Sequence, residues 1–279
     1  MSEINNEKFC DLTFDEKIKY FKKMGHIVPD KSLIKTPIQI EKIKESAKIN
    51  TALLDFIEQK IHAGMSTQDI DHIVYEFTTS HNAICAPFHY QSYPKHVCTS
   101  INEVVCHGIP SKNEILKDGD IINVDVSTIY NGYYSDASRM FCIGNIDEKK
   151  KKLIEVAKEC LLKGIEAAKP WGFVGDISEA ICEHAFANGY SVVREFGGHG
   201  IGLEFHEDPF ISHVGKKKTG MLLVPGMIFT VEPMINMGSP RVFVSKKDHW
   251  TVKTCDGLPS AQWEHMILVT ENGIEILSK

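Results

Sequence analysis

Residues 121–141 read IINVDVSTIYNGYYSDASRMF, two runs of β-branched and aromatic residues joined by Asn131-Gly132. An Asn-Gly pair between such runs is the strongest short-range signal for a two-residue type I′ turn, so this stretch predicts a β-hairpin. With Asn131 and Gly132 as the loop, Tyr130 pairs with Tyr133. The register of every other cross-strand pair follows from that one.

The predicted register places two aspartates on one face of the hairpin. Asp125 lies opposite Ser138 and Asp136 opposite Ser127, so the aspartates are diagonal neighbours with Cα atoms about 7–8 Å apart. Asp125 interrupts an apolar run, where burying an unpaired carboxylate is costly, and this favours a cation or a polar partner. The hairpin alone leaves open an exposed strand face that carries two aspartates.

Helical patterns lie on both sides of the hairpin. Thr36-Pro37, an N-cap residue followed by proline at the first helical position, begins a long apolar periodicity that we expect to end at Gly64. Residues 66–69 resemble a capping box and predict a second helix that reaches Ser80. Residues 148–168 and 176–188 form a similar pair of helical patterns later in the chain.

The remaining periodic segments alternate as strands do. Besides residues 121–130 and 133–143, we expect strands over residues 190–196, 227–234, 241–244, 250–254 and 262–270. The order is thus helix pair, strands, helix pair, strands, with more hairpins than crossovers. It predicts an α+β fold in which helices pack on one face of an antiparallel sheet.

Composition excludes several classes of protein. The 279 residues are 43% apolar and 24% charged, typical of a globular chain, and no apolar run approaches the roughly 20 residues that a membrane-spanning helix needs. The first ten residues lack the apolar region of a secretory signal, so we expect a cytoplasmic location. A net charge of −6 argues against a surface specific for nucleic acid. Eight cysteines without a CxxC spacing indicate neither a disulfide framework nor a thiolate zinc site.

Three more residues of the metal-ligating type lie in apolar or glycine-rich surroundings. His199 stands within GGHGIG, whose glycines do not fit the dinucleotide-binding pattern GxGxxG. Glu232 interrupts an apolar strand before a proline, and Glu264 lies in the last predicted strand. Each residue alone has an ordinary structural explanation. Together with the two aspartates they suit two divalent ions, Mn²⁺, Fe²⁺ or Co²⁺, which activate water for hydrolysis.

The five residues with their flanks closely resemble the type I methionine aminopeptidases. The segments that carry the resemblance are NVDV, YSDASRMF, GGHGIG, TVEPM and AQWEHMI, with further matches in YQSYP (residues 90–94), HVCTSINEVVCHGIP, FHEDP and WTVKT. The similarity runs from Thr36 to the C-terminus. It implies the pita-bread fold, a curved antiparallel sheet with two helix pairs on its outer face and pseudo-two-fold symmetry. It also divides the chain into an N-terminal extension, residues 1–35, and a catalytic domain, residues 36–279.

The resemblance assigns roles residue by residue. It implies that Asp125 binds one metal ion, that His199 and Glu232 bind the other, and that Asp136 and Glu264 bridge both, with Glu232 as the proton shuttle. The substrate-binding residues that it implies are His107 and His206 beside the scissile bond, and Tyr90, Tyr93, Cys98, Phe205 and Trp250 around the methionine side chain. Zn²⁺ and Ni²⁺ are alternative metals, and a monovalent cation is expected near Asn102 and Ser260.

The implied reaction is removal of the initiator methionine from nascent proteins whose second residue is small. His199 and Glu232 are 33 positions apart, which leaves no room for the long helical insertion of the type II enzymes. Proline-specific aminopeptidases and prolidases share the fold and ligands but usually carry a large N-terminal domain. A binding protein that has lost catalysis on the same fold is the other alternative. We expect a monomer that contacts nascent chains and the ribosome.

The N-terminal extension carries one patterned stretch. Phe14, Ile18 and Phe21 recur at helical spacing. We therefore expect residues 1–35 to contain an amphipathic helix that packs against the catalytic domain or contacts the ribosome.

Overall fold

The predicted hairpin lies at the centre of the computed structural model, which describes residue 9 and residues 11–279. β4 (Ile121–Tyr130) and β5 (Tyr133–Cys142) pair with Tyr130 opposite Tyr133, as predicted. Asn131 and Gly132 have φ angles of 52° and 82°, the left-handed conformation that a type I′ turn needs at both positions. The sequence therefore predicted both the turn and the register correctly.

The hairpin belongs to a curved sheet of nine strands, and all of its strand pairs are antiparallel. Its strand order is β1 (Ile84–Cys85), β4, β5, β14 (Glu264–Thr270), β9 (Ile228–Val231), β7 (Gly198–Gly200) and β8 (Glu207–Ile211), with β2 (Cys98–Ile101) beside β4 and β15 (Gly273–Ser278) beside β14. Two further sheets have three strands each, β13 (Ser260–Gln262), β10 (Met234–Asn236) and β6 (Ser191–Val192), and β11 (Val242–Val244), β12 (Val252–Thr254) and β3 (Val104–Cys106).

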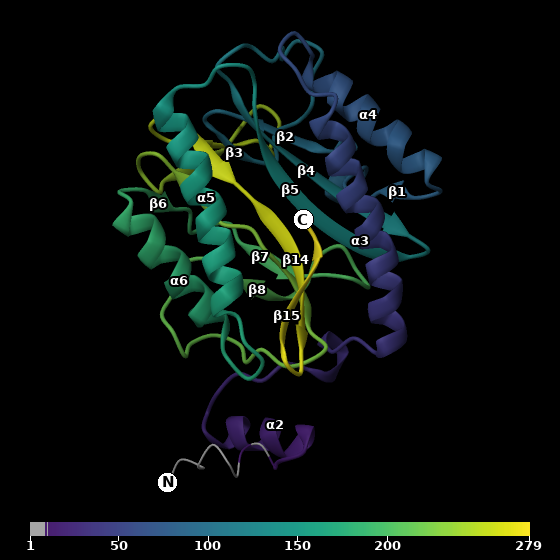
Figure 1. Ribbon diagram of the computed structural model, residues 1–279, viewed down its shortest axis with the longest axis vertical. Coiled ribbons are helices and arrows are strands. Elements are labelled where there is room, and N and C mark those ends of the chain that lie inside the picture. Colours follow the sequence, from purple (N-terminus) through teal and green to yellow (C-terminus); the bar gives the residue numbers. More distant parts are fainter. Residues whose placement is uncertain (1–8, 10) are drawn as a thin grey trace.

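Two helix pairs lie on opposite sides of the sheet's midline, α3 (Pro37–Glu58) with α4 (Thr67–Ser80), and α5 (Glu148–Ala167) with α6 (Val174–Ala187) (Figure 1). Thr36 and Ser66 form the predicted capping boxes. α3 ends at Glu58, earlier than the predicted Gly64. The Gly64 N–H instead donates to the Leu116 carbonyl at 2.8 Å, so this segment joins a neighbouring loop.

The hairpin register separates the core from the opposite face. Val124, Val126 and Ala137 are fully buried in the cluster that includes residues of α3 and α4. Because side chains alternate along a strand, Asp125 and Asp136 point to the concave face, away from these helices. Phe229 and Val231 of β9 join the cluster beneath α5 and α6 in the same way. The concave face of the sheet is therefore free to carry polar side chains.

Two predicted strands are each divided between sheets. Residues 227–234 form β9 and β10 with Glu232-Pro233 between them, and residues 262–270 end β13 and form β14, with Trp263 between those strands. Pro233 has no backbone N–H for a ladder, so the chain leaves the first sheet there. The predicted strand over residues 190–196 is only Ser191–Val192, because the chain then turns to line the cavity described below. β1, β2, β3, β7, β8 and β15 were not predicted.

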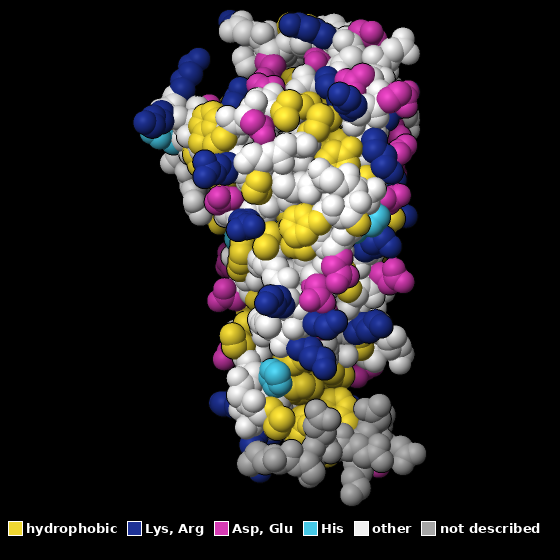
Figure 2. Space-filling model, turned by 90° about the vertical axis from the view of Figure 1, so that its left-hand side faces the viewer, with side chains coloured by type: hydrophobic (Ala, Val, Ile, Leu, Met, Phe, Trp, Pro, Cys, Tyr) yellow, Lys and Arg dark blue, Asp and Glu magenta, His cyan; other side chains and the backbone are white. Residues whose placement is uncertain are grey.

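None of the described helices is both long and apolar enough to span a membrane. The face seen in Figure 2 carries Lys or Arg and Asp or Glu side chains interspersed with one another. The seven cysteines of the described part of the chain are unpaired, in agreement with their spacing in the sequence.

The N-terminal helix α2 (Phe14–Lys23) packs against the rest of the molecule, near the end of the α5–α6 connection (Figure 1). Phe21 is stacked on Trp171 with ring centroids 6.4 Å apart, and it meets Phe173 edge-on at 5.9 Å. Phe14 approaches Trp171 to 5.3 Å. The predicted apolar stripe is therefore the contact surface of α2. The boundary after residue 35 stays a prediction.

Replacing Phe21 by alanine should lower the free energy of unfolding by about 1–3 kcal/mol, because a half-buried ring is lost from an aromatic cluster. Chemical denaturation measures the change, with the exposed Lys22→Ala as the matched control. Equal stability of the two variants would show that α2 contributes nothing to the fold.

Candidate active site

One cavity of about 430 Å³ opens on the concave face of the sheet. It is lined by all twelve residues that the resemblance assigned to the divalent metal ions or to the substrate: Tyr90, Tyr93, Cys98, His107, Asp125, Asp136, His199, Phe205, His206, Glu232, Trp250 and Glu264. These residues come from segments spread over 175 positions of the chain, from residue 90 to residue 264, and the fold brings them together.

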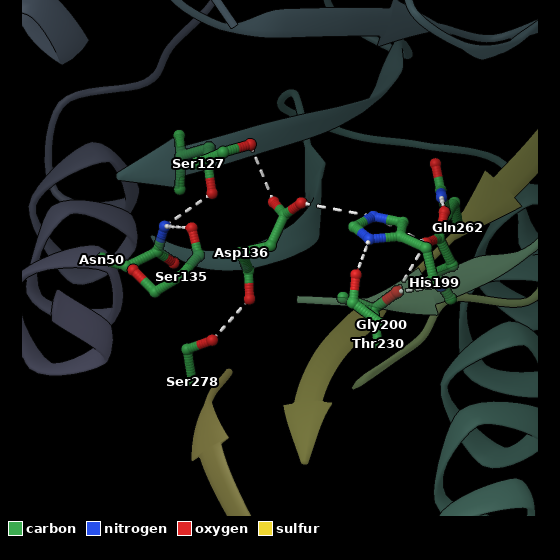
Figure 3. A network of polar contacts seen from close by, with 11 residues as sticks. Asn50, Ser127, Ser135, Asp136, His199, Gly200, Thr230, Gln262 and Ser278 are labelled. Atoms are coloured by element: carbon green, nitrogen blue, oxygen red, sulfur yellow. Dashed lines mark hydrogen bonds and ion pairs between the residues drawn. The ribbon is translucent and has the colours of Figure 1, made fainter. Parts of the chain in front are cut away.

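Three of the predicted ligands converge closely. Asp136, His199 and Glu264 each offer a ligand atom, and these atoms all lie within 4.8 Å of one another. His199 Nε2 is 3.7 Å from Asp136 Oδ2 (Figure 3). The same nitrogen is 3.8 Å from Glu232 Oε1. The geometry thus groups four of the five residues, and Asp125 faces the same cavity from β4.

Glycines permit the approach of β7, which carries His199. A Cβ on Gly198 would lie 2.2 Å from the Thr230 carbonyl oxygen, and one on Gly200 would lie 2.1 Å from that of Asp208. Only residues without a side chain fit these positions. The His199 ring pairs its Nδ1 with the Gly200 carbonyl at 3.0 Å, which leaves Nε2 directed at the carboxylates.

Neighbouring polar groups orient the carboxylates. The Ser127 hydroxyl donates to Asp136 Oδ1 at 2.9 Å. The Thr230 hydroxyl donates to Glu232 Oε1 at 2.8 Å, and the Gln262 amide donates to Glu232 Oε2 at 3.0 Å. These partners were not named as site residues in the sequence. Ser127, Thr230 and Gln262 each lie two positions from a ligand, so the period of two of a strand was the signal that pointed to them.

Burial raises the pKa of all four carboxyl groups. Burial raises the pKa of Asp125 to about 7 and that of Glu232 to about 8. Burial and then the neighbouring charges raise the pKa of Asp136 and of Glu264 well above their usual range. No lysine or arginine lies among the described residues that line the cavity.

Asp125 Oδ1 is buried without a hydrogen-bond partner among the described residues. An orphaned acceptor of this kind, beside three other carboxylates and one imidazole, is the donor set that divalent cations take. The residues present therefore fit a metal centre.

The opposite wall of the cavity is aromatic. Tyr93 is 2% exposed and donates its hydroxyl to the Val97 and Gly108 carbonyls, so its ring is held rigidly. Trp250 lies edge-on to Tyr93 at 5.1 Å. Burial raises the pKa of the Cys98 thiol well above its usual range, which keeps that group neutral. This wall is apolar and polarizable, as a thioether side chain requires.

Two further histidines, His107 and His206, line the same cavity. His206 lies 4.1 Å from the ring of His199 and stacks on Tyr90 at 5.0 Å. His107 has a φ of 57° and lies 5.9 Å from Trp250. Burial lowers the pKa of His107 to about 4, so its ring is neutral at neutral pH and keeps one N–H to donate.

The predicted monovalent-cation position lies outside this cavity. The Ser260 N–H donates to the Asn102 carbonyl at 2.9 Å. The Asn102 side chain is engaged by the ammonium group of Lys150, which donates to Oδ1 at 2.9 Å. A cation at Asn102 would have to share this site with Lys150.

Comparisons with known proteins agree with the geometry. Residues 41–271 match the model of metallopeptidase family M24. The methionine aminopeptidase of Chlamydia pneumoniae is 49% identical over 249 residues, which cover 88% of this chain and 84% of that protein. The crystal structure of the methionine aminopeptidase from Rickettsia prowazekii is 46% identical, with a TM-score of 0.87 over 88% of this chain and 99% of that one.

The proline-specific branch is more distant. The X-Pro aminopeptidase of Thermotoga maritima is 23% identical, with a TM-score of 0.70 over 88% of this chain and 62% of that one, and this shows the shared fold alone. The chain therefore belongs to metallopeptidase family M24 and, within it, to the methionine aminopeptidases.

Proposed function

We propose that the protein removes the N-terminal methionine from nascent polypeptides whose second residue is small. The observation that carries the proposal is that a cluster of metal-ligating side chains and a rigid aromatic wall line the same cavity. If the side chain of the substrate methionine packs against Tyr93 and Trp250, the peptide bond between this methionine and the second residue lies beside the carboxylates. The preference for a small second residue comes from the resemblance and is part of the proposal.

The ligand roles come from the resemblance, and the convergence of Asp136, His199 and Glu264 supports them. Asp125 would hold one divalent ion, His199 and Glu232 the other, and Asp136 and Glu264 both. Bound there, two such ions supply a nucleophilic water at neutral pH and polarise the scissile carbonyl. The rest of the catalysis belongs to side chains of the protein.

Glu232 is placed to move the proton. Its two oxygens are held by Thr230 and Gln262, so the carboxylate keeps one orientation while it takes a proton from water and passes it to the leaving amine. His107 and His206 donate hydrogen bonds to the substrate beside the scissile bond, where charge develops in the tetrahedral intermediate.

The finer assignments remain part of the proposal. We propose Mn²⁺, Fe²⁺ or Co²⁺ as the physiological metal, with Zn²⁺ and Ni²⁺ as alternatives. All of them suit this donor set, and their availability in the cell decides which one binds. A monovalent cation near Asn102, contact with the ribosome, a monomeric state and a cytoplasmic location are further predictions.

The test is release of free amino acid from three tripeptides by metal-stripped protein with Mn²⁺ or Co²⁺ restored. We expect metal-dependent cleavage of Met-Ala-Ser, and at least about tenfold slower cleavage of Met-Leu-Ser because a larger second residue loses transition-state contacts. Cleavage of Ala-Pro-Ala would place the protein in the proline-specific branch. Binding of metal with no cleavage of any peptide would indicate a binding protein.

A further inference from the structure

Lys35 is a buried lysine that the proposed reaction does not use. It is 4% exposed as a residue and its side chain is 1% exposed. Its ammonium group forms an ion pair and hydrogen bond with Oε2 of Glu207, whose side chain is 11% exposed. Lysine is almost never fully buried without a partner, so this pair fixes where both side chains lie.

Glu207 is the first residue of β8 and ends the segment of residues 202–207, called here the 202–207 loop, which leads from β7 into β8. Its Oε1 accepts hydrogen bonds from the backbone N–H groups of Leu203 at 2.7 Å and Glu204 at 3.0 Å. Its Oε2 receives the Lys35 ammonium. One carboxylate therefore satisfies two backbone donors of the loop and attaches the loop to a segment 172 positions away.

The 202–207 loop presents two residues to the cavity, Phe205 and His206. Phe205 is 8% exposed and is held by its neighbours. His206 is exposed, and within the described chain its ring has stacking contacts but no hydrogen bond to hold it. The position of the His206 ring therefore depends on the backbone of the loop.

The backbone of Lys35 and that of the next residue are also held in place. Its backbone N–H donates to the Gly226 carbonyl at 2.8 Å, in the turn before β9, and Thr36 then caps α3. A Cβ on Gly202 would lie 3.4 Å from Lys35 Cε and 2.5 Å from Ile43 Cδ1, so the loop lies directly against this segment. The ion pair connects the start of α3, the turn before β9 and the loop at one point.

We propose that Lys35 is a positioning residue for His206: through Glu207 it fixes the 202–207 loop, and with it the imidazole that contacts the substrate. The proposal rests on the proposed function for the role of His206. Loss of Lys35 leaves Glu207 buried without its cation, a strongly unfavourable state. Glu207 then turns toward water and releases Leu203 and Glu204, and His206 loses its place.

The experiment measures two variants of the full chain, Lys35→Met and the double variant Lys35→Met/Glu207→Gln. Methionine keeps the aliphatic stem of Lys35, and glutamine at position 207 still accepts both backbone hydrogen bonds. The double variant leaves no unpaired buried charge, so it folds even where the single variant does not. The control is Lys44→Met, which removes the surface ion pair with Glu275, at 2.9 Å.

Lys35→Met should lose about 10- to 100-fold in kcat/KM for Met-Ala-Ser, the size expected when a catalytic group is displaced by about 1 Å. The double variant keeps the hydrogen bonds of Leu203 and Glu204 but loses the attachment of the loop to position 35, so its loss should lie at the lower limit, about tenfold. The affinity for Mn²⁺, measured by calorimetry, should stay within about twofold of wild type because no ligand lies in the loop. In a His206→Ala background the same substitutions should cost less than about threefold, since the group they position is gone.

A second readout does not depend on activity. Hydrogen exchange should be faster at the Leu203 and Glu204 amides in Lys35→Met, and the ring signals of His206 should shift in NMR spectra of histidine-labelled protein. Lys44→Met should change none of these quantities. If wild type releases no methionine, the proposed function fails, and exchange and NMR still decide the positioning role.

Two results would overturn the proposal. Equal losses of activity with and without His206 would mean that Lys35 acts on the fold as a whole. Wild-type turnover and wild-type ring signals in the folded double variant would mean that the ion pair positions nothing.

Discussion

Replacing Glu264 by alanine is expected to abolish metal-dependent release of methionine, with turnover reduced on the order of 10³-fold or more. Glu264 is 2% exposed, and its carboxylate belongs to the converging group with Asp136 and His199. A ligand shared by two ions contributes several kcal/mol of transition-state stabilisation, and about 1.4 kcal/mol corresponds to a factor of ten. Addition of excess metal should not restore activity, because the carboxylate proposed to hold both ions together is gone.

Calorimetry with Mn²⁺ should show weaker binding by the same variant, and the melting temperature in excess metal should fall accordingly. The metal-free form should behave differently. Glu264→Gln tests this, because glutamine removes the charge and keeps the size of the side chain. Loss of one of four neighbouring carboxylates relieves repulsion, so metal-free Glu264→Gln should be at least as stable as metal-free wild type. Glu271→Ala, an exposed substitution in the following turn, is the matched control. Near-wild-type turnover of Glu264→Ala at saturating metal would refute the ligand assignment.

Replacing His107 by alanine should lower kcat about 10²- to 10³-fold without loss of metal. The neutral imidazole lies in the cavity between Trp250 and Phe196, where it can donate a hydrogen bond to the reacting carbonyl. Removal of one such donor costs about 2.7–4 kcal/mol in the transition state. KM should change much less, because the charge that the donor stabilises develops only as the reaction proceeds.

Metal content and steady-state kinetics together check this expectation. His72→Ala is the control, since His72 is an exposed residue of α4, away from the cavity. A His107→Ala protein that has lost its metal would show that His107 is a ligand, and the division of the cavity into ligands and substrate contacts would then be wrong.

The parts of the fold that were predicted correctly depend on local chemistry. Asn131-Gly132 fixes the hairpin because the turn needs two left-handed residues, and that turn alone sets the register of Asp125 and Asp136. Helix starts were predicted because Thr36 and Ser66 satisfy the first backbone donors within their own segment. Both kinds of signal lie within a few residues of the element that they define.

The parts that were missed depend on distant neighbours. The stretch GGHGIG has the composition of a turn, but it contains the strand β7. Its glycines are needed because the backbones of Thr230 and Asp208 lie too close to leave room for side chains. The break after Val231 depends on which sheet each half of the segment joins, and periodicity carries no such information. Lys35 and Glu207 are ordinary charged residues in the sequence, and only the fold makes them a buried pair.

The roles of the site residues came mostly from the resemblance. From the residues alone, two aspartates on a computed register and three ligand-type residues in apolar surroundings indicated a dinuclear metal site. The aromatic wall had no sequence signature of its own, because Tyr93 and Trp250 are 157 positions apart and meet only in the folded chain.

The order of the ligands along the chain bears on how the protein is made. Asp125 is synthesised first among the five proposed ligands, and Glu264 follows 139 positions later. During translation an emerging chain can form the β4–β5 hairpin early, but β14 can pair with β5 only after its own residues have emerged. The proposed metal centre therefore cannot be completed before residue 264 has emerged, and a product that stops before that residue would be inactive.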